Sequence, residues 1–209
     1  HVVVFPLHDV LPIEHVARRA REAVQSAGTV HAALWGHATP NTERRWNDRL
    51  KALEDGLKTT TLWRAPHTRH VVGLPTTNVR VESMTERDGV LTVVPEPRSL
   101  VDCLLAPAER RPGVSDIAMM EQRLSMMDVF DGTEARRAFY QAWGETVPSS
   151  WTSPSSMSTV NGGVWIWRYE AMLLMLAEAR AFGLREQAKR CDRWPVSYTH
   201  LTLPTTTSV

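Results

Sequence analysis

Short apolar runs alternate with amphipathic stretches over the first 65 residues. Three of these runs have the length of a strand: residues 2–5, 29–35 and 60–63. Between them, apolar side chains recur at steps of three and four over 13–27 and 46–57, which predicts two helices, and Gly28 marks the expected end of the first. Because strand-helix-strand units with short connections form parallel sheets, the pattern predicts a short, Rossmann-like parallel sheet at the N-terminus.

A different pattern begins after residue 71. Asp88 and Gly89 lie between two apolar-rich segments, 78–85 and 90–94. An Asp-Gly pair in this position is typical of a hairpin with a type I′ turn. Beyond the hairpin the apolar spacing becomes helical, and four helices are expected: 99–106, 116–127, 134–143 and 164–182. The predicted fold class is therefore α/β, with a short parallel sheet, an appended antiparallel hairpin and a helical C-terminal part.

The domain organisation is read from changes in composition. Residues 164–182 are apolar nearly all round, so this helix is expected to run through the core. Residues 145–163 before it are rich in Ser, Thr and Pro, which predicts a surface loop or a subdomain junction. We expect residues 1–194 to form one α/β domain. We expect this domain to be truncated, because His1 stands in place of an initiator Met and leads directly into the first predicted strand.

The last 15 residues differ from the rest of the chain. Residues 195–209 contain no charged side chain and have no helical period. The string PVSYTHLTLPTT at 195–206 resembles the conceptual translation of a transposon-type sequencing adaptor over twelve consecutive residues. This resemblance implies that the natural sequence is cut near Trp194 and that 195–209 is a non-native tail outside the fold and the site.

Net charge and cysteine content indicate which partners and which cellular compartment to expect. The chain carries 24 basic and 23 acidic side chains, a formal net charge of +1, so nothing in its overall charge favours nucleic acid or an anionic membrane as a partner. The two cysteines form no CxxC motif, which is typical of reduced thiols in a cytoplasmic protein. No apolar run reaches the roughly 18 residues that a membrane span needs. We therefore expect a cytoplasmic chain without a membrane segment.

Histidines provide the candidate chemistry, because all seven outside the tail fall within residues 1–70. His8 with Asp9, His37 and His67 each follow a predicted strand. Since ligands bind at the C-terminal edge of parallel strands, we expect these side chains to share one edge. Imidazole and carboxylate groups there could bind a metal or exchange protons. None of these residues has a diagnostic metal spacing, however, and ordinary polar surface turns remain the alternative.

Two functions follow as hypotheses. The first is binding of a small polar ligand at the strand edge, extending to a hydrolase or transferase in which His8, Asp9, His37 and His67 are catalytic. The second is a non-catalytic nucleic-acid- or protein-binding module that uses the arginines of the first two helices. The sequence has no GxGxxG and no Walker motif, so it predicts no phosphate cradle. Cofactor, metal and oligomeric state stay open.

Overall fold

The computed structural model describes residues 10–40, 72–74, 79–94, 110–130, 132–152 and 163–200, and every structural statement below refers to these residues. Most of them are helical. The N-terminal part contains α1 (Ile13–Arg18), α2 (Ala20–Ala33), the 3₁₀ turn η1 (Trp35–His37) and β1 (Thr39–Pro40). After β2 (Val72–Gly73) come the 3₁₀ turn η2 (Val81–Ser83), β3 (Met84–Arg87) and β4 (Val90–Val93). The C-terminal part contains α5 (Gly113–Leu124), α6 (Thr133–Gly144), the 3₁₀ turn η3 (Ser149–Trp151), α7 (Gly163–Ala181) and α8 (Arg185–His200).

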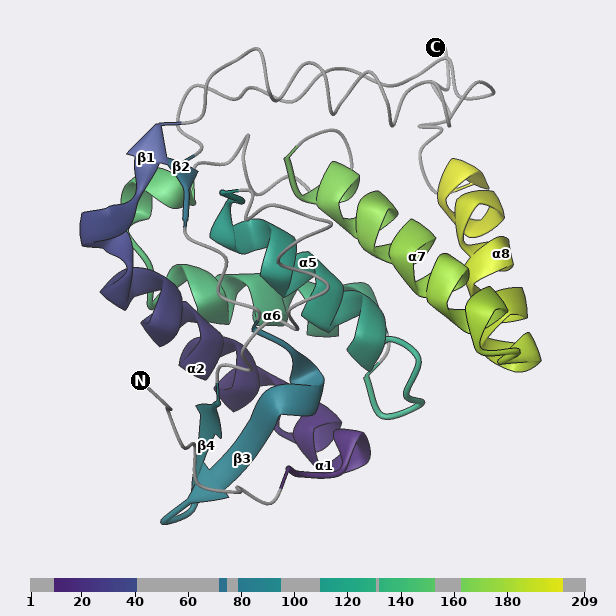
Figure 1. The fold of residues 1–209 in the computed structure, drawn as a ribbon, viewed down its shortest axis with the longest axis horizontal. Coiled ribbons are helices and arrows are strands. Elements are labelled where there is room, and N and C mark those ends of the chain that lie inside the picture. Colours follow the sequence, from purple (N-terminus) through teal and green to yellow (C-terminus); the bar gives the residue numbers. More distant parts are fainter. Residues whose placement is uncertain are drawn as a thin grey trace, which may run out of the picture.

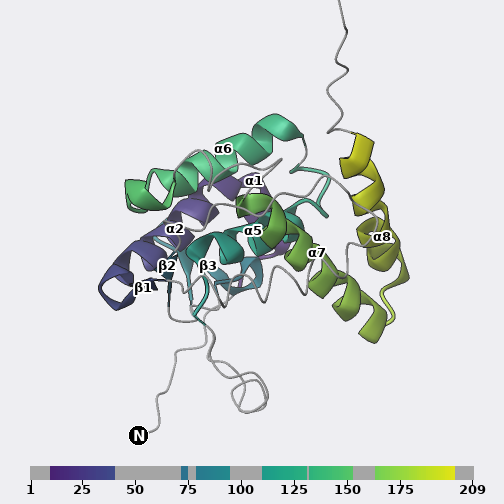
Figure 2. The ribbon, with the colours of Figure 1, turned by 90° about the horizontal axis from the view of Figure 1, so that it is seen from above.

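The helices form a layered bundle beside one hairpin. α2 contacts α6, α5 and β4, and α5 in turn contacts α7, which carries α8 on its other side (Figure 1). Seen from above, α7 again lies between α5 and α8 (Figure 2). No described helix is long and apolar enough to cross a membrane.

The hairpin β3–β4 confirms the expected Asp-Gly turn. Asp88 and Gly89 both have positive φ values, 53° and 79°. A type I′ turn needs this backbone conformation at its two central residues, and Asp and Gly adopt it readily. The strands pair antiparallel from Met84 opposite Val93 to Arg87 opposite Val90. Leu91 and Val93 point into the core, so the hairpin closes one end of the bundle.

Two apolar clusters hold the layers together. The larger one joins α2, the hairpin, α5 and α6, with Val24, Leu91, Ile117 and Trp143 among its buried members. The smaller one lies where α5, α7 and α8 meet, and we call its sulfur-bearing members the sulfur cluster: Met119, Met126, Met172, Met175 and Cys191. The helices expected over 116–127, 134–143 and 164–182 are confirmed as α5, α6 and α7.

The predicted parallel sheet is wrong for the part of the chain that the structure describes. Residues 29–33, expected to start a strand, continue α2. Both described sheets are two-stranded and antiparallel, β1 with β2 and β3 with β4. Several other expected elements lie outside the described residues: strands 2–5 and 60–63, and helices 46–57 and 99–106.

Gly28 explains the error, because it is an interior residue of α2 and not its end. The buried positions Ala23, Val24, Ala27, Gly28 and His31 continue one helical stripe past the glycine. A Cβ at Gly28 would lie 1.8 Å from Thr146 Oγ1, so the missing side chain lets the turn after α6 approach the helix. A glycine that permits close packing looks like a helix stop in the sequence alone.

Residues of the expected loop and tail are described only in part. Residues 145–152 of the Ser/Thr/Pro-rich segment are described and include η3, whereas 153–162 lie outside the described residues. α8 extends to His200 and so overlaps the first six residues of 195–209. The single domain and the non-native tail both stay predictions.

Candidate ligand-binding site

Of the four residues expected to form a site, the structure describes only His37, while His8, Asp9 and His67 lie outside the described residues. His37 ends η1 with an exposed side chain, and its backbone carbonyl accepts a hydrogen bond from the Arg110 guanidinium. The shared edge depended on a parallel sheet, which the described strands do not form. That these four side chains lie together therefore stays a prediction, and the parallel sheet from which it was inferred is not found in the described residues.

His31 has a packing role in the structure. Its ring is completely buried between α2, α5 and α6. The Trp143 indole N–H donates to Nδ1 at 3.1 Å, and Nε2 lies 3.2 Å from Asp116 Oδ2. Because indole nitrogen only donates, Nδ1 must be the acceptor, so the neutral ring carries its proton on Nε2 and donates it to Asp116. His31 thus joins three helices.

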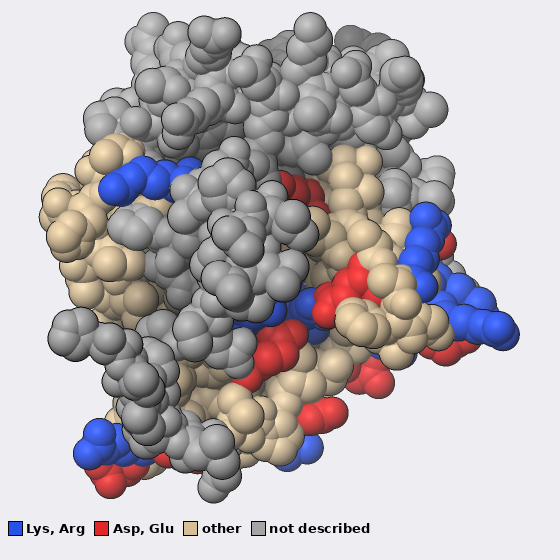
Figure 3. Space-filling model, viewed as in Figure 1, with Lys and Arg blue, Asp and Glu red and all other residues tan. Residues whose placement is uncertain are grey.

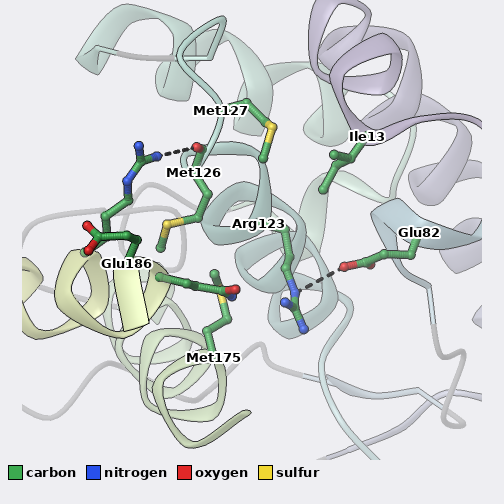
Figure 4. Close-up of a pocket in the computed structure, with 9 residues that line it drawn as sticks. Ile13, Glu82, Arg123, Met126, Met127, Met175 and Glu186 are labelled. Atoms are coloured by element: carbon green, nitrogen blue, oxygen red, sulfur yellow. Dashed lines mark hydrogen bonds and ion pairs between the residues drawn. The ribbon is translucent and has the colours of Figure 1, made fainter. Parts of the chain in front are cut away.

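A cleft of about 280 Å³ opens where α1, η2, α5, α7 and α8 converge (Figure 4). Its apolar lining residues are Ile13, Met126, Met127 and Met175, and its polar ones are Glu82, Arg123, Glu186, Gln187 and Arg190. In Figure 4, Met126 and Met175 lie on the side of α8, whereas Met127 faces Ile13 of α1. We call this space the cleft.

The end of α5 positions two of the methionines. α5 stops at Leu124, and the chain continues in a tight turn in which Met126 N–H donates to the Arg123 carbonyl and Met127 N–H to the Leu124 carbonyl. Consecutive side chains therefore point to different walls of the cleft. α8 docks on this turn, because Arg190 Nη1 donates to the Met126 carbonyl at 2.8 Å.

Charged groups of both signs line the cleft. The Arg123 guanidinium bridges two acids, since its Nε lies 3.3 Å from Glu82 Oε1 and its Nη2 donates to Glu178. Glu186 pairs with Lys189 across one helical turn at 2.8 Å and stays 81% exposed. The lining side chains thus carry two positive and two negative charges beside the apolar side chains of Ile13 and the three methionines.

A buried ion cluster behind the cleft fixes the helix that carries Arg123. Glu121 on α5 is fully buried and accepts hydrogen bonds from Arg168 Nε at 2.5 Å and Nη2 at 3.1 Å. It also accepts from Arg136 on α6 and from Gln122. Burial, together with the nearby Glu121 carboxylate, raises the pKa of Tyr140 well above its usual value. Both neighbouring helices are therefore anchored to α5.

The polar chemistry of the cleft comes from carboxylate, amide and guanidinium groups. Among the residues that the structure describes, its polar lining consists of Glu82, Arg123, Glu186, Gln187 and Arg190 and includes no Ser, Cys or His. No group of three or more His, Cys, Asp or Glu among the described residues could hold a metal ion. Carboxylates and guanidinium groups can instead accept from a ligand ammonium and donate to ligand oxygens.

The sequence analysis missed these residues for a physical reason. The charged residues of the cleft come from segments about 40 to 100 positions apart, and only Glu186 and Arg190 have a readable spacing, one helical turn. Met126 and Met127 belong to the amphipathic stretch expected over 116–127, where methionine usually means core.

Comparisons with known proteins give a likeness of fold. No known protein family and no curated protein matches the sequence. Glucosamine kinase in crystal form B has a TM-score of 0.57 and 15% identity, covering 92% of this chain and 55% of that one. Glucosamine kinase in complex with glucosamine, ADP and inorganic phosphate has a TM-score of 0.56 and 15% identity, covering 92% and 53%. Crystal form A has a TM-score of 0.55 and 16% identity, covering 93% and 53%.

This chain spans about half the length of the solved structures that it matches. At this level of identity the likeness concerns the path of the backbone and not the identity of site residues. The chain is therefore similar in fold to part of glucosamine kinase.

Proposed function

We propose that this chain binds a small polar ligand of the amino-sugar type in the cleft. The observation that carries the proposal is the likeness to glucosamine kinase over 92% of the chain, one of those structures holding glucosamine, ADP and inorganic phosphate. Likeness of fold alone does not transfer a ligand, so the proposal also depends on whether the cleft has suitable chemistry.

The lining of the cleft suits such a ligand. An amino sugar presents one ammonium group and several hydroxyl groups. Glu82 and Glu186 offer carboxylate oxygens to the ammonium, and Arg123 and Arg190 offer donors to the hydroxyl oxygens. The methionine side chains that line the cleft can adapt their shape to the apolar face of the sugar ring.

The proposed role is binding of the ligand in the cleft. Phosphoryl transfer to a small polar acceptor is the second candidate, and the same likeness to a kinase favours it.

The charges on the described surface speak against the nucleic-acid alternative. Lys and Arg lie beside Asp and Glu on the face drawn in Figure 3. Of the arginines expected to form a basic face, Arg19 pairs with Glu22 and Glu86, and Arg21 pairs with Glu145. A nucleic-acid footprint needs a continuous basic stripe, and these pairs interrupt it.

Calorimetric titration of the chain with glucosamine tests the binding proposal. We expect saturable binding that weakens several-fold in Glu82→Gln and in Glu186→Gln, since each change removes a carboxylate charge that can pair with a bound ammonium. Glu145→Gln is the matched control, because Glu145 is also a half-exposed carboxylate paired with an arginine but lies away from the cleft. The Glu145→Gln variant should bind glucosamine with the same affinity as the unchanged chain.

A phosphorylation assay with ATP and glucosamine separates the two candidates. Binding without sugar phosphate is the expected result. Formation of sugar phosphate would establish the second candidate, and absence of saturable glucosamine binding would overturn the proposal. Equal weakening by Glu145→Gln would place the ligand outside the cleft.

A further inference from the structure

Five sulfur-bearing side chains belong to the apolar cluster in which α8 packs, together with Tyr169, Leu173 and Leu176. Met172 and Met175 of α7 and Cys191 of α8 are buried together, with the partly buried Met119 and Met126 of the α5 segment packed against them. Thioethers are polarizable and fill irregular gaps well, but peroxides oxidise them. The surface on which α8 packs therefore contains sulfur atoms that can be oxidised.

Met126 meets α8 in two ways. Its side chain packs against the cluster that contains Cys191, and its backbone carbonyl accepts the hydrogen bond from Arg190. Among the described residues, an exposed pair between Arg180 of α7 and Asp192 also joins α8 to a neighbouring helix. Exposed pairs contribute little to stability, so the position of α8 depends strongly on the apolar cluster in which Met126 packs.

Access separates Met126 from the deeper sulfur atoms. Met126 is partly exposed and lines the open cleft, whereas Met172 and Met175 are only 2% and 1% exposed. Cys191 is completely buried, and burial raises the pKa of its thiol, which keeps it in the protonated, unreactive form. A peroxide in the cleft therefore reaches a thioether before it reaches the thiol.

We propose that Met126 is a reversible oxidation site that releases α8 from the bundle. The oxidant is a peroxide. The Met126 sulfur attacks one peroxide oxygen, an S–O bond forms and the O–O bond breaks, and the sulfur loses two electrons. The proton on the transferred oxygen passes to the other peroxide oxygen, which leaves as water or an alcohol. The product is methionine sulfoxide, which sulfoxide reductases convert back to the thioether. This inference is independent of the ligand proposed above.

The sulfoxide loosens α8 because it places a polar S=O group against apolar neighbours. The buried side chains packed there are those of Tyr169, Met172, Met175 and Cys191, which are mostly apolar, whereas the donors Arg123, Gln187 and Arg190 line the open cleft. A polar atom without a donor in such surroundings is costly. The oxidised side chain is therefore expected to turn outward into the cleft, which removes packing from α8.

Met127 provides a matched comparison. It follows Met126 directly and also lines the cleft, but it packs against the larger cluster of α2, the hairpin, α5 and α6 and not against α8. Oxidation at Met127 is therefore expected to leave α8 in place. Met84 and Met120 are completely buried in that larger cluster and report whether the fold stays closed during treatment.

The test combines brief treatment with dilute hydrogen peroxide, peptide mass spectrometry and amide hydrogen exchange of residues 185–192. We expect Met126 to be oxidised before Met84, Met120, Met172 and Met175. Exchange in 185–192 should become roughly ten- to hundredfold faster, the equivalent of one unpaired buried polar group. Incubation with methionine sulfoxide reductases should restore the slow exchange.

Two conservative variants assign the effect. In Met126→Leu, which keeps the side-chain volume, peroxide should leave the exchange of 185–192 unchanged, and in Met127→Leu the acceleration should persist. The proposal is overturned if Met126 is oxidised no faster than Met172 and Met175, or if its oxidation leaves exchange in 185–192 unaltered. Acceleration that survives Met126→Leu would also overturn it.

Discussion

Glu121 is fully buried, and its surroundings account for how three helices meet. Its carboxylate accepts from Arg168 of α7 and Arg136 of α6 while it sits on α5. A buried charge is costly unless it is paired and hydrogen-bonded, so the three side chains specify one arrangement of these helices. Arg123, two residues further along α5, is thereby held at the cleft.

Replacing Glu121 with Ala is expected to lower the free energy of unfolding by about 3–5 kcal/mol, because the buried guanidinium of Arg168 would lose two hydrogen bonds to the Glu121 carboxylate. Glu145→Ala removes a half-exposed partner of Arg21 and should cost about 0–1 kcal/mol. Urea unfolding followed by circular dichroism measures both. Similar losses in the two variants would contradict the role given to Glu121.

Residue types predicted some of these roles and not others. His31 is packed and hydrogen-bonded in α2, in a stretch where a strand was expected. The partners of Glu121 could not be predicted, because Arg168 lies 47 positions away and nothing local marks the pair. Long-range polar contacts depend on the tertiary path, which propensity does not encode.

At the scale of elements, α2 shows how one glycine misdirects a prediction. The apolar spacing over 13–27 was recognised, but the helix breaks at Arg19 and then continues to Ala33. Arg19 stands between α1 and α2 and reaches the hairpin through Glu86 and the Gly89 carbonyl. The hairpin was predictable because its turn is defined by two adjacent residues, whereas the extent of α2 depends on what packs against it.

A Gly28→Ala substitution tests the packing role of this glycine. The added methyl would meet Thr146 Oγ1 at 1.8 Å and Trp143 at 3.1 Å, so we expect a loss of about 1–3 kcal/mol despite the better helix propensity of Ala. Gly36→Ala is the control, since no atom lies within 4 Å of a Cβ there. Thermal unfolding of the two variants should differ by several degrees. A stabilised Gly28→Ala protein would show that Gly28 is an ordinary helix position.

At the scale of the whole molecule, the sequence indicated the C-terminal helices and the hairpin but misread how the N-terminal part is arranged. Local signals were enough for α5, α6 and α7, whose apolar faces repeat with the helical period. Parallel pairing was inferred from the order of elements, and order alone does not determine which strands pair. The cleft was missed because helices and turns far apart in sequence contribute one to three residues each.

The most direct test of the account is a methyl NMR titration, with glucosamine, of chain labelled at its eight methionines. If the cleft binds the ligand, the methyl signals of Met126, Met127 and Met175, which line it, should shift in a saturable manner. Those of Met84 and Met120, buried in the larger cluster, should stay in place. Saturable shifts confined to methionines outside the cleft, or no shift at any ligand concentration, would contradict the account.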